Sequence, residues 1–372
     1  MIHYDIRQAR ESDIDTVTAM YDYSRSLMRA AGNMTQWVGY PTREHVAADV
    51  ALGASWLVTA DGTPVGSFAL VPGEEPTYGI IVRGRWMDPS SPYVTLHRMA
   101  KATAVHGIAE TAFAFAKERH PYLRVDTHES NTAVRHILEQ QGFVYSGIVF
   151  MDDGTERLAY EWWRHDTVPA DLQAWVEREV LPQYDHFDAA HRRDHARRVI
   201  ARAMLLQPTP LTYVAAAMHD LGLAEGREVH HLASGRRIRA CRDLQRWFSD
   251  EEVEQIAQAA EDHRASATTP PRSRLGMIIA EADRDVEPET IVRRTVEYGL
   301  SHYPELDREG HWQRTLQHLH EKYAEGGYIK LWLDDSPNAA PLAELRALIK
   351  DEPRLRTLFN NYFNTNTQQT NH

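Results

Sequence analysis

The chain has 372 residues but only one cysteine, Cys241, so no disulfide bond can form within it. Scarce cysteine is typical of proteins from a reducing compartment, and we expect a cytoplasmic location. The sequence also has no apolar stretch near the ~20 residues that a membrane-spanning helix needs. Its first residues lack the apolar core of a signal peptide. We therefore expect no membrane association.

Clusters of positive charge are missing as well. The chain has 41 lysines and arginines against 53 aspartates and glutamates, a net charge of −12, and no run rich in lysine or arginine. Because nucleic-acid backbones are bound mainly through positive charge, we do not expect nucleic acid as a partner. A local site could still hold a small anion. The expected partners are small-molecule substrates, and a homodimer is compatible with them.

The hydrophobic content of 42%, in a chain that is long for one core, predicts two domains. The first part mixes strand-like and helix-like patterns, with a hairpin expected over residues 56–71. Past His165 the strand signal nearly vanishes and apolar residues recur at helical spacing. The sequence thus predicts a mixed α/β domain over residues 1–163 and an all-helical domain over residues 167–372.

Histidines and aspartates stand at the ends of helical apolar runs in the second half. His219 and Asp220 end one run, Asp283 follows another, and His195 opens a third. Neighbours on a helix point about 100° apart, at ~3.6 residues per turn, but from a helix end both can reach one ion. Imidazoles with carboxylates suit Mn, Fe, Co, Ni or Zn, and Mg less well. We therefore predict one or two divalent metal ions, held by His195, His219, Asp220 and Asp283, with His231 and His263 as further ligands or as groups that neutralise a substrate phosphate.

Two short motifs frame this pattern. Residues 188–199 read Asp-Ala-Ala-His-Arg-Arg-Asp-His-Ala-Arg-Arg-Val, and residues 280–285 read Ala-Glu-Ala-Asp-Arg-Asp. They resemble the opening and closing motifs of the HD phosphohydrolase superfamily. The resemblance implies an HD domain that hydrolyses a phosphoester of a nucleotide or small phosphometabolite, with Asp220 in a catalytic role. His231 is preferred to His230, because Ser234 follows it at the spacing that the resemblance implies.

A different chemistry is also open to this ligand set. Six ligands in the order H…HD…H…H…D can hold two irons, and some members of the HD superfamily are di-iron oxygenases. An oxygen-dependent activity of the helical half is therefore an alternative to phosphoester hydrolysis.

Two strand-to-helix junctions are the informative features of the first half. Ala104-Val-His-Gly-Ile-Ala109 places small residues where a helix begins, so that backbone N–H groups could approach a pyrophosphate. The stretch 126–142 has a strand end, Asn131 at a helix start, and Gly142 after the helix. The first junction alone is also compatible with an ordinary tight turn.

Together these junctions resemble the GNAT acetyltransferases over essentially all of residues 1–163. The resemblance implies a GNAT-like mixed α/β sheet that binds acetyl-coenzyme A (acetyl-CoA) and transfers its acetyl group to an amine of a small molecule or protein. Trp37, Tyr40, Tyr78 and Trp86 would line an acceptor pocket or belong to the core. The residues expected to bind the coenzyme are Arg98, Met99, Ala104, Val105, His106, Gly107, Ile108, Ala109 and Asn131.

The sequence departs from the family pattern at two positions. Ala104 stands where the family usually has Gln or Arg, and Leu138 stands where a tyrosine acid is frequent. Protonation of the coenzyme thiolate would then use another group or water. Candidate catalytic bases are Glu74, Glu75 and His97, which could also be a solvated loop and an inward-facing histidine. A non-catalytic acetyl-CoA sensor that regulates the helical half is the alternative function.

Overall fold

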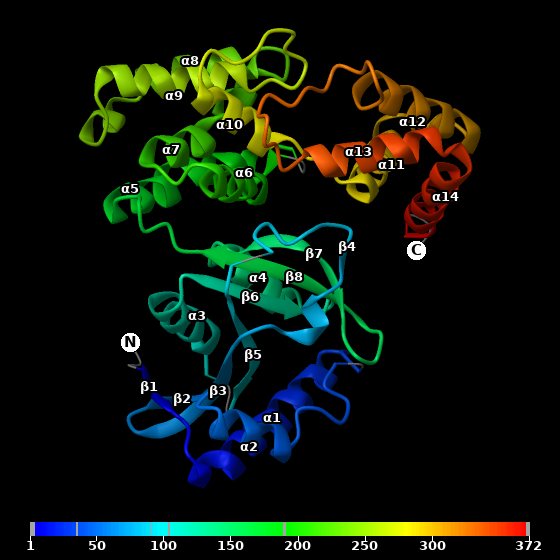
Figure 1. Cartoon of the computed structure of the whole chain (residues 1–372). Coiled ribbons are helices and arrows are strands. Elements are labelled where there is room, and N and C mark those ends of the chain that lie inside the picture. The colour runs from blue at the N-terminus through cyan, green and yellow to red at the C-terminus, as the bar shows by residue number, and fades with distance from the viewer. Residues whose placement is uncertain (1–3, 35, 90, 103–104, 189–190, 370–372) are drawn as a thin grey trace. The chain divides into compact units, whose positions relative to one another are not determined.

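The computed structural model describes residues 4–34, 36–89, 91–102, 105–188 and 191–369. It divides the chain into two compact units, Met1–Arg164 and His165–His372 (Figure 1). The first unit combines a sheet with helices, and the described part of the second unit contains helices and no strand. The predicted fold class, a mixed α/β domain followed by an all-helical one, is confirmed.

The first unit is built on one eight-stranded sheet with the strand order β1-β2-β3-β5-β6-β8-β7-β4. All neighbouring strands are antiparallel except β5 and β6, which are parallel. The strands are β1 (Tyr4–Gln8), β2 (Ser55–Ala60), β3 (Thr63–Pro72), β4 (Ile81–Val82), β5 (Val94–Lys101), β6 (Tyr122–Thr127), β7 (Val144–Phe150) and β8 (Glu156–Trp163).

The sheet opens between β5 and β6. These strands pair at two positions only, Val94 with Leu123 and Thr95 with Arg124, although both strands continue beyond them. A parallel pair normally keeps its ladder of hydrogen bonds along its length. The early end of the ladder therefore means that the two strands splay apart, and the residues just after the last pair lie at the vertex of the opening.

Helices cover both faces of the sheet. Side chains of a strand alternate between its faces, so neighbouring apolar residues pack into different cores. Val58 packs in the core formed with α3 (Ile108–Arg119), and its neighbour Leu57 packs in the core formed with α1 (Ile14–Ala30) and α2 (Arg43–Ala51). The fourth helix of this unit, α4 (Thr132–Gln140), adds Leu138 to the core on the side of α3.

The second unit contains two hydrophobic cores. The first includes residues of α5 to α10 and the second residues of α11 to α14. None of the described helices is long and apolar enough to cross a membrane. The helices are α5 (Ala170–Trp175), α6 (Arg193–Leu206), α7 (Pro210–Met218), α8 (His230–Ala240), α9 (Asp250–Asp262), α10 (Arg274–Asp283), α11 (Pro288–His302), α12 (Arg308–Lys322), α13 (Ala339–Lys350) and α14 (Glu352–Gln369).

Candidate metal centre and acetyl-transfer site

The candidate metal centre lies where the ends of five helices of the second unit meet. Residues Tyr213–Met218 of α7 are all buried, so this helix runs through the core and carries the two residues after it into the interior. The ends of the neighbouring helices bring the remaining polar side chains to the same place. These side chains are His195 near the start of α6, His219 and Asp220 after α7, His230 at the start of α8, His263 after α9, and Asp283 at the end of α10.

Four of these residues form a first group. The ligand atoms of His195, His219, Asp220 and Asp283 all lie within 4.8 Å of one another. Nε2 of His195 is 3.3 Å from Oδ1 of Asp283, and Nε2 of His219 is 3.3 Å from Oδ2 of Asp220. Two imidazoles and two carboxylates at this spacing can surround one cation of the first-row transition series.

A second group shares Asp220 with the first and adds His230 and His263. Nε2 of His263 is 3.2 Å and Nε2 of His230 is 3.5 Å from Oδ1 of Asp220. The two histidine nitrogens are 3.2 Å apart. The two oxygens of Asp220 therefore face two different sets of imidazoles, which is the arrangement of a carboxylate that bridges two neighbouring cations.

Three of the four histidines are oriented by backbone carbonyl groups. Nδ1 of His219 donates to the carbonyl of Ala216 at 2.8 Å, and Nδ1 of His263 donates to the carbonyl of Ala260 at 2.5 Å. His230 makes the same kind of bond at 2.7 Å. A carbonyl can only accept, so Nδ1 carries the proton in a neutral ring and Nε2 presents a lone pair. The lone pairs therefore point into the cluster.

Buried nitrogen atoms without a well-aligned hydrogen bond show that these residues fit a metal. Nε2 of His195 and Nε2 of His219 are buried and make no well-aligned hydrogen bond among the described residues; each faces an aspartate oxygen 3.3 Å away. A buried polar atom without a partner costs about 1–3 kcal/mol. A divalent cation would satisfy both lone pairs and balance the two carboxylates, so the donor set and its burial agree with a metal centre.

The charges of the cluster are strongly coupled. Burial lowers the pKa of His219, but Asp220 and Asp283 outweigh this effect and raise it to about 10. Burial on its own would raise the pKa of Asp220, yet its contacts with His219, His195 and His263 hold it well below the ordinary value. Both carboxylates are thus ionised at neutral pH, and an incoming cation has to displace the proton that this raised pKa leaves on His219.

Close packing positions the second group. The N–H group of Gly222 donates to Oγ of Ser234 on α8 at 2.8 Å. A Cβ atom at Gly222 would overlap the carbonyl oxygen of His230 and the backbone nitrogen of Ser234, and would lie 2.8 Å from Cβ of Ala233. The absence of a side chain therefore lets α8 start directly against the turn that follows Asp220.

One predicted ligand, His231, is not among the residues of the two groups. The spacing to Ser234 favoured His231 over His230, but the structure brings His230 beside Asp220 and His263. No contact between His231 and the aspartates is seen among the described residues. The reason is helical geometry: residues four apart lie on one face of a helix. Ser234 faces the turn after Asp220, and His230 is four residues before it. That spacing was the signal that could have identified His230.

The first unit brings together some of its predicted catalytic residues. His97 lies on β5, and its Nε2 is 3.1 Å from Oε2 of Glu75. The other oxygen of Glu75 accepts a hydrogen bond from the Thr77 backbone at 3.2 Å. The hydrogen bond from His97 is the main reason why the pKa of Glu75 is lowered to about 2. Glu74 is exposed, and no contact joins it to His97 within the described residues.

The predicted coenzyme-binding segment begins α3. Gly107 is the N-cap at φ +85°, and no side chain caps the helix there. The first N–H groups of a helix have no partner within it, so these amides remain available to an anion. Ile108 is buried, Val105 and Ala109 are half-buried, and His106 is exposed. Ala104 lies outside the described residues.

Two other predicted coenzyme residues have side chains with protein partners. Arg98 forms a two-pronged ion pair with Asp49 at 2.7 Å and donates to the hydroxyl of Tyr40 at 2.6 Å. Oδ1 of Asn131 accepts from the backbone of Val134 at the start of α4. Their side chains stabilise the unit, as does half-buried Met99, which packs against the core.

The aromatic residues belong mainly to the interior. Tyr78 and Trp86 are buried in one small core cluster, so they do not form an open wall. Trp37 packs edge-on against Tyr21, and Tyr40 is bound to Arg98. Of the two readings offered by the sequence, pocket or core, the structure favours core for Tyr78 and Trp86.

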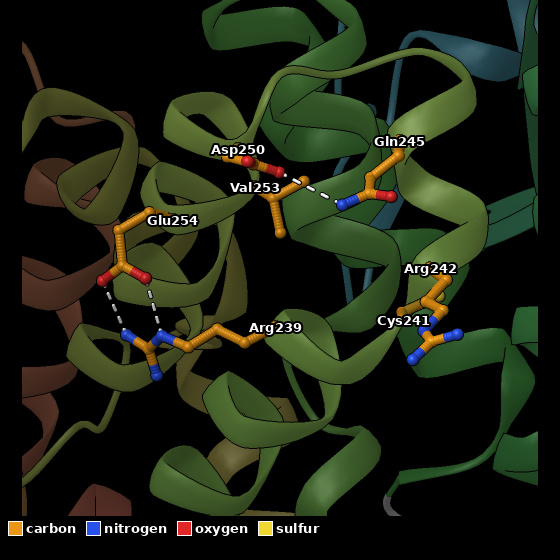
Figure 2. Close-up of a pocket in the computed structure, with 7 residues that line it drawn as sticks. All are labelled: Arg239, Cys241, Arg242, Gln245, Asp250, Val253 and Glu254. Carbon is orange, nitrogen blue, oxygen red and sulfur yellow. Dashed lines mark hydrogen bonds and ion pairs between the residues drawn. The ribbon is translucent and has the colours of Figure 1, made fainter.

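A small cavity of about 190 Å³ on the second unit is separate from the metal centre (Figure 2). Some of its polar side chains bind one another: Arg239 donates to Glu254 at 2.7 Å, and Gln245 donates to Asp250 at 3.1 Å. None of the candidate metal ligands lines it. The lining residues are Arg239, Cys241, Arg242, Gln245, Asp250, Val253 and Glu254.

Comparison with known proteins supports both resemblances. Residues 192–286 match the family model of the HD domain. A GNAT-family acetyltransferase from Streptococcus agalactiae is 31% identical over 44% of this chain and 99% of its own, with a TM-score of 0.41. A GNAT acetyltransferase from Listeria monocytogenes is 18% identical over 44% and 96% of the two chains, with a TM-score of 0.36. No curated protein matches the chain.

The streptococcal protein is matched along nearly its whole length, by the N-terminal part of this chain. The HD domain model falls entirely within the second unit. Both resemblances noted in the sequence are thus confirmed. The chain joins an acetyltransferase unit of the GNAT family to a helical unit that carries an HD domain, the domain of a superfamily of metal-dependent hydrolases.

Proposed function

We propose that the chain is a bifunctional enzyme. Its first unit transfers the acetyl group of acetyl-CoA to an amine of a small molecule or protein. Its second unit hydrolyses a phosphoester of a nucleotide or small phosphometabolite at a divalent metal centre. The observation that supports the second activity most strongly is the convergence of imidazole Nε2 atoms on both oxygens of Asp220. Small-molecule partners and a homodimer stay predictions.

In the second unit, one cation would be held by the group that contains His195, His219 and Asp283. The neighbouring cation would be held by His230 and His263, with Asp220 shared between the two. A divalent metal bound there polarises a phosphoryl oxygen and makes water a nucleophile near neutral pH. The protein fixes the imidazole lone pairs through their Nδ1–carbonyl bonds and keeps both carboxylates ionised.

Positive side chains near Asp283 support an anionic substrate. Lys322 on α12 is half-buried; its ammonium group lies 5.0 Å from the centre of the Tyr323 ring and has no hydrogen bond or ion pair within the described part of the chain. Burial lowers its pKa, and Asp283 is the carboxylate that most opposes this effect. Arg294 is 2.9 Å and Arg202 is 4.0 Å from Asp285. An ammonium group without an ion-paired carboxylate near the metal centre favours a phosphate as the counter-charge.

The test of this activity is a hydrolysis screen of nucleotides and small phosphomonoesters with Mn, Fe, Co, Ni, Zn or Mg supplied in turn. We expect activity that is lost in the double variant His219→Ala/Asp220→Ala and kept in His231→Ala, the matched control next to the centre. Hydrolysis that survives the double variant would contradict the assignment.

The same residues also suit two irons, which keeps an oxygenase as the second candidate. The observation that favours it is the count of histidines, because imidazole is a good ligand of iron. Protein that is prepared without oxygen, loaded with iron and then exposed to oxygen should show no oxygen-dependent turnover if the hydrolase proposal holds.

In the first unit, His97 is the proposed base. Glu75 is ionised, so it accepts the Nε2–H of the ring, and Nδ1 of the neutral ring is left as the acceptor. Acetyl-CoA supplies an activated acetyl thioester. His97 accepts a proton from the amine, so the amine nitrogen can attack the acetyl carbon. The coenzyme pyrophosphate is expected at the N–H groups around Val105–Ala109.

Titration with coenzyme A and an acetylation assay across amines test this activity. We expect binding together with acetyl transfer, and loss of transfer without loss of coenzyme binding in His97→Ala. Coenzyme binding without transfer to any amine would favour the sensor alternative instead.

A further inference from the structure

The vertex of the opening between β5 and β6 holds two facing polar side chains. In the register set by the last pairs of these strands, the next residues on the same face are His97 and Asp126. Nδ1 of His97 is 3.8 Å from Oδ1 of Asp126. Both side chains reach solvent, with 16% and 11% of their surfaces exposed. A ligand that enters the opening would therefore meet this pair.

Asp126 is held in place from the other side. The hydroxyl group of Tyr78 donates to Oδ1 of Asp126 at 2.7 Å. Tyr78 is buried, and the indole of Trp86 donates to its backbone carbonyl at 2.8 Å. Burial and the Asp126 charge raise the pKa of Tyr78 well above its ordinary value, so it remains a donor at neutral pH. The carboxylate thus has a fixed orientation toward the opening.

The charge around this pair is negative. Glu75 and Asp126 flank the imidazole of His97, so the cluster has an excess of one carboxylate even when the ring is protonated. The nearby arginines are already neutralised, since Arg98 pairs with Asp49 and Arg124 lies 3.7 Å from Glu161. A cationic ligand would balance the remaining charge.

The distance between Nδ1 of His97 and Oδ1 of Asp126 fits a ligand nitrogen that donates hydrogen bonds. At 3.8 Å the two atoms are too far apart for a direct hydrogen bond. A nitrogen at ~2.9 Å from each could donate to both at once. Neutral His97 offers a lone pair on Nδ1, and Asp126 offers its carboxylate oxygen. Because His97 of this pair is the proposed base, the donor that the pair suits is the nucleophile of the acetyl transfer.

We propose that Asp126 is the specificity-determining residue of the acetyl-transfer site: it binds the acceptor's ammonium group beside Nδ1 of His97, and the acceptor is therefore a cationic alkylamine. This inference rests on the proposed acetyl transfer. Tyr78 acts through Asp126 as a positioning residue.

The proton balance of the step follows from this placement. The bound ammonium gives one proton to Nδ1 of His97 and becomes a neutral amine. Its lone pair forms the C–N bond as the C–S bond of the thioester breaks. The second proton leaves the nitrogen and ends on the coenzyme thiolate, directly or through water. The His97 imidazolium, stabilised by Glu75 and Asp126, then returns its proton to solvent.

Steady-state kinetics of the full chain with two classes of acceptor test the inference. Primary alkylamines are cationic at pH 7.5, whereas anilines are neutral. In Asp126→Asn we expect KM for alkylamines to rise about 10-fold or more, as for loss of a charged hydrogen-bond partner. KM for anilines and for acetyl-CoA should stay within about 2-fold of wild type on the same reasoning. Asp152→Asn, in the exposed turn between β7 and β8, is the matched control.

Tyr78→Phe provides a second variant that keeps the buried ring. It should raise KM for alkylamines by a smaller factor than Asp126→Asn, with the same split between the two classes. If the wild-type chain acetylates alkylamines and both variants have the same KM for them, the inference is overturned while the proposed acetyl transfer stands. An equal loss for alkylamines and anilines would also overturn it, because that is the signature of a purely structural role. A wild-type chain that acetylates no amine would overturn the proposed transfer and this inference with it.

Discussion

Replacing Gly222 with alanine should disturb the group that contains His230 and His263 and leave the group that contains His195 and His219 intact. The added Cβ would overlap the carbonyl oxygen of His230 and the backbone nitrogen of Ser234. Both belong to backbone at the start of α8, which cannot turn aside as a flexible side chain could. The helix start would have to move by about 1 Å to reach an ordinary contact distance. His230 would move with it, and a metal–ligand bond tolerates a change of only about 0.2 Å.

The expected cost follows from overpacking and a weakened hydrogen bond. Forcing an extra methyl group into a packed site costs about 1–3 kcal/mol, and the bond from Gly222 to Ser234 contributes about 1 kcal/mol. Alanine offsets up to about 1 kcal/mol by restricting the unfolded chain. The free energy of unfolding of the second unit should therefore fall by about 1–3 kcal/mol. That corresponds to a decrease in Tm of roughly 2–12 °C for a unit of this size.

Metal analysis and calorimetry of the same samples measure both effects. The variant should keep one metal ion per chain, at the group that contains His195 and His219, and should unfold earlier than wild type. Gly79→Ala is the control, because a Cβ there meets only the Pro76 carbonyl, at 3.5 Å. Two ions per chain and an unchanged Tm in Gly222→Ala would refute the reasoning.

Three further predictions concern the same two sites. His230→Ala should lower the metal content of the purified chain, and His231→Ala should leave it unchanged. The reverse result would support His231 as the ligand, as the sequence predicted. In the metal-free protein the pKa of His219 is raised to about 10, so its contribution to stability is present below pH 6.5 and is lost as the pH rises toward 10. A metal ion must displace that proton, so titrations in two buffers should show proton release at pH 7.5 and affinity that rises with pH; binding without proton release would count against the charge coupling. Gly107→Val should weaken coenzyme A binding in calorimetry while metal content stays constant, because valine is strained at φ +85°; unchanged affinity would move the coenzyme away from the start of α3.

Much of the fold could be predicted because its signals are local. The loss of alternating patterns after His165 reflects the end of the sheet, and the apolar run before His219 marks a helix that the core buries on all sides. Histidines and aspartates at the ends of such runs can meet only if the helices pack together. Their grouping around Asp220 was therefore predictable from sequence, although which atoms face each other was not.

The remaining features depend on contacts between distant residues. The choice between His230 and His231 depends on the rotation of α8, which the contact between Gly222 and Ser234 sets. The contact of Tyr78 with Asp126 joins residues 48 positions apart, across a sheet that opens at that point. No local pattern records such a pairing.

The metal content of the purified full-length chain tests the central claim most directly. Elemental analysis should find two transition-metal ions per wild-type chain and none in His219→Ala/Asp220→Ala, with both proteins folded by calorimetry. A folded wild-type chain that takes up no divalent metal, or a double variant that retains its full metal content, would contradict the account.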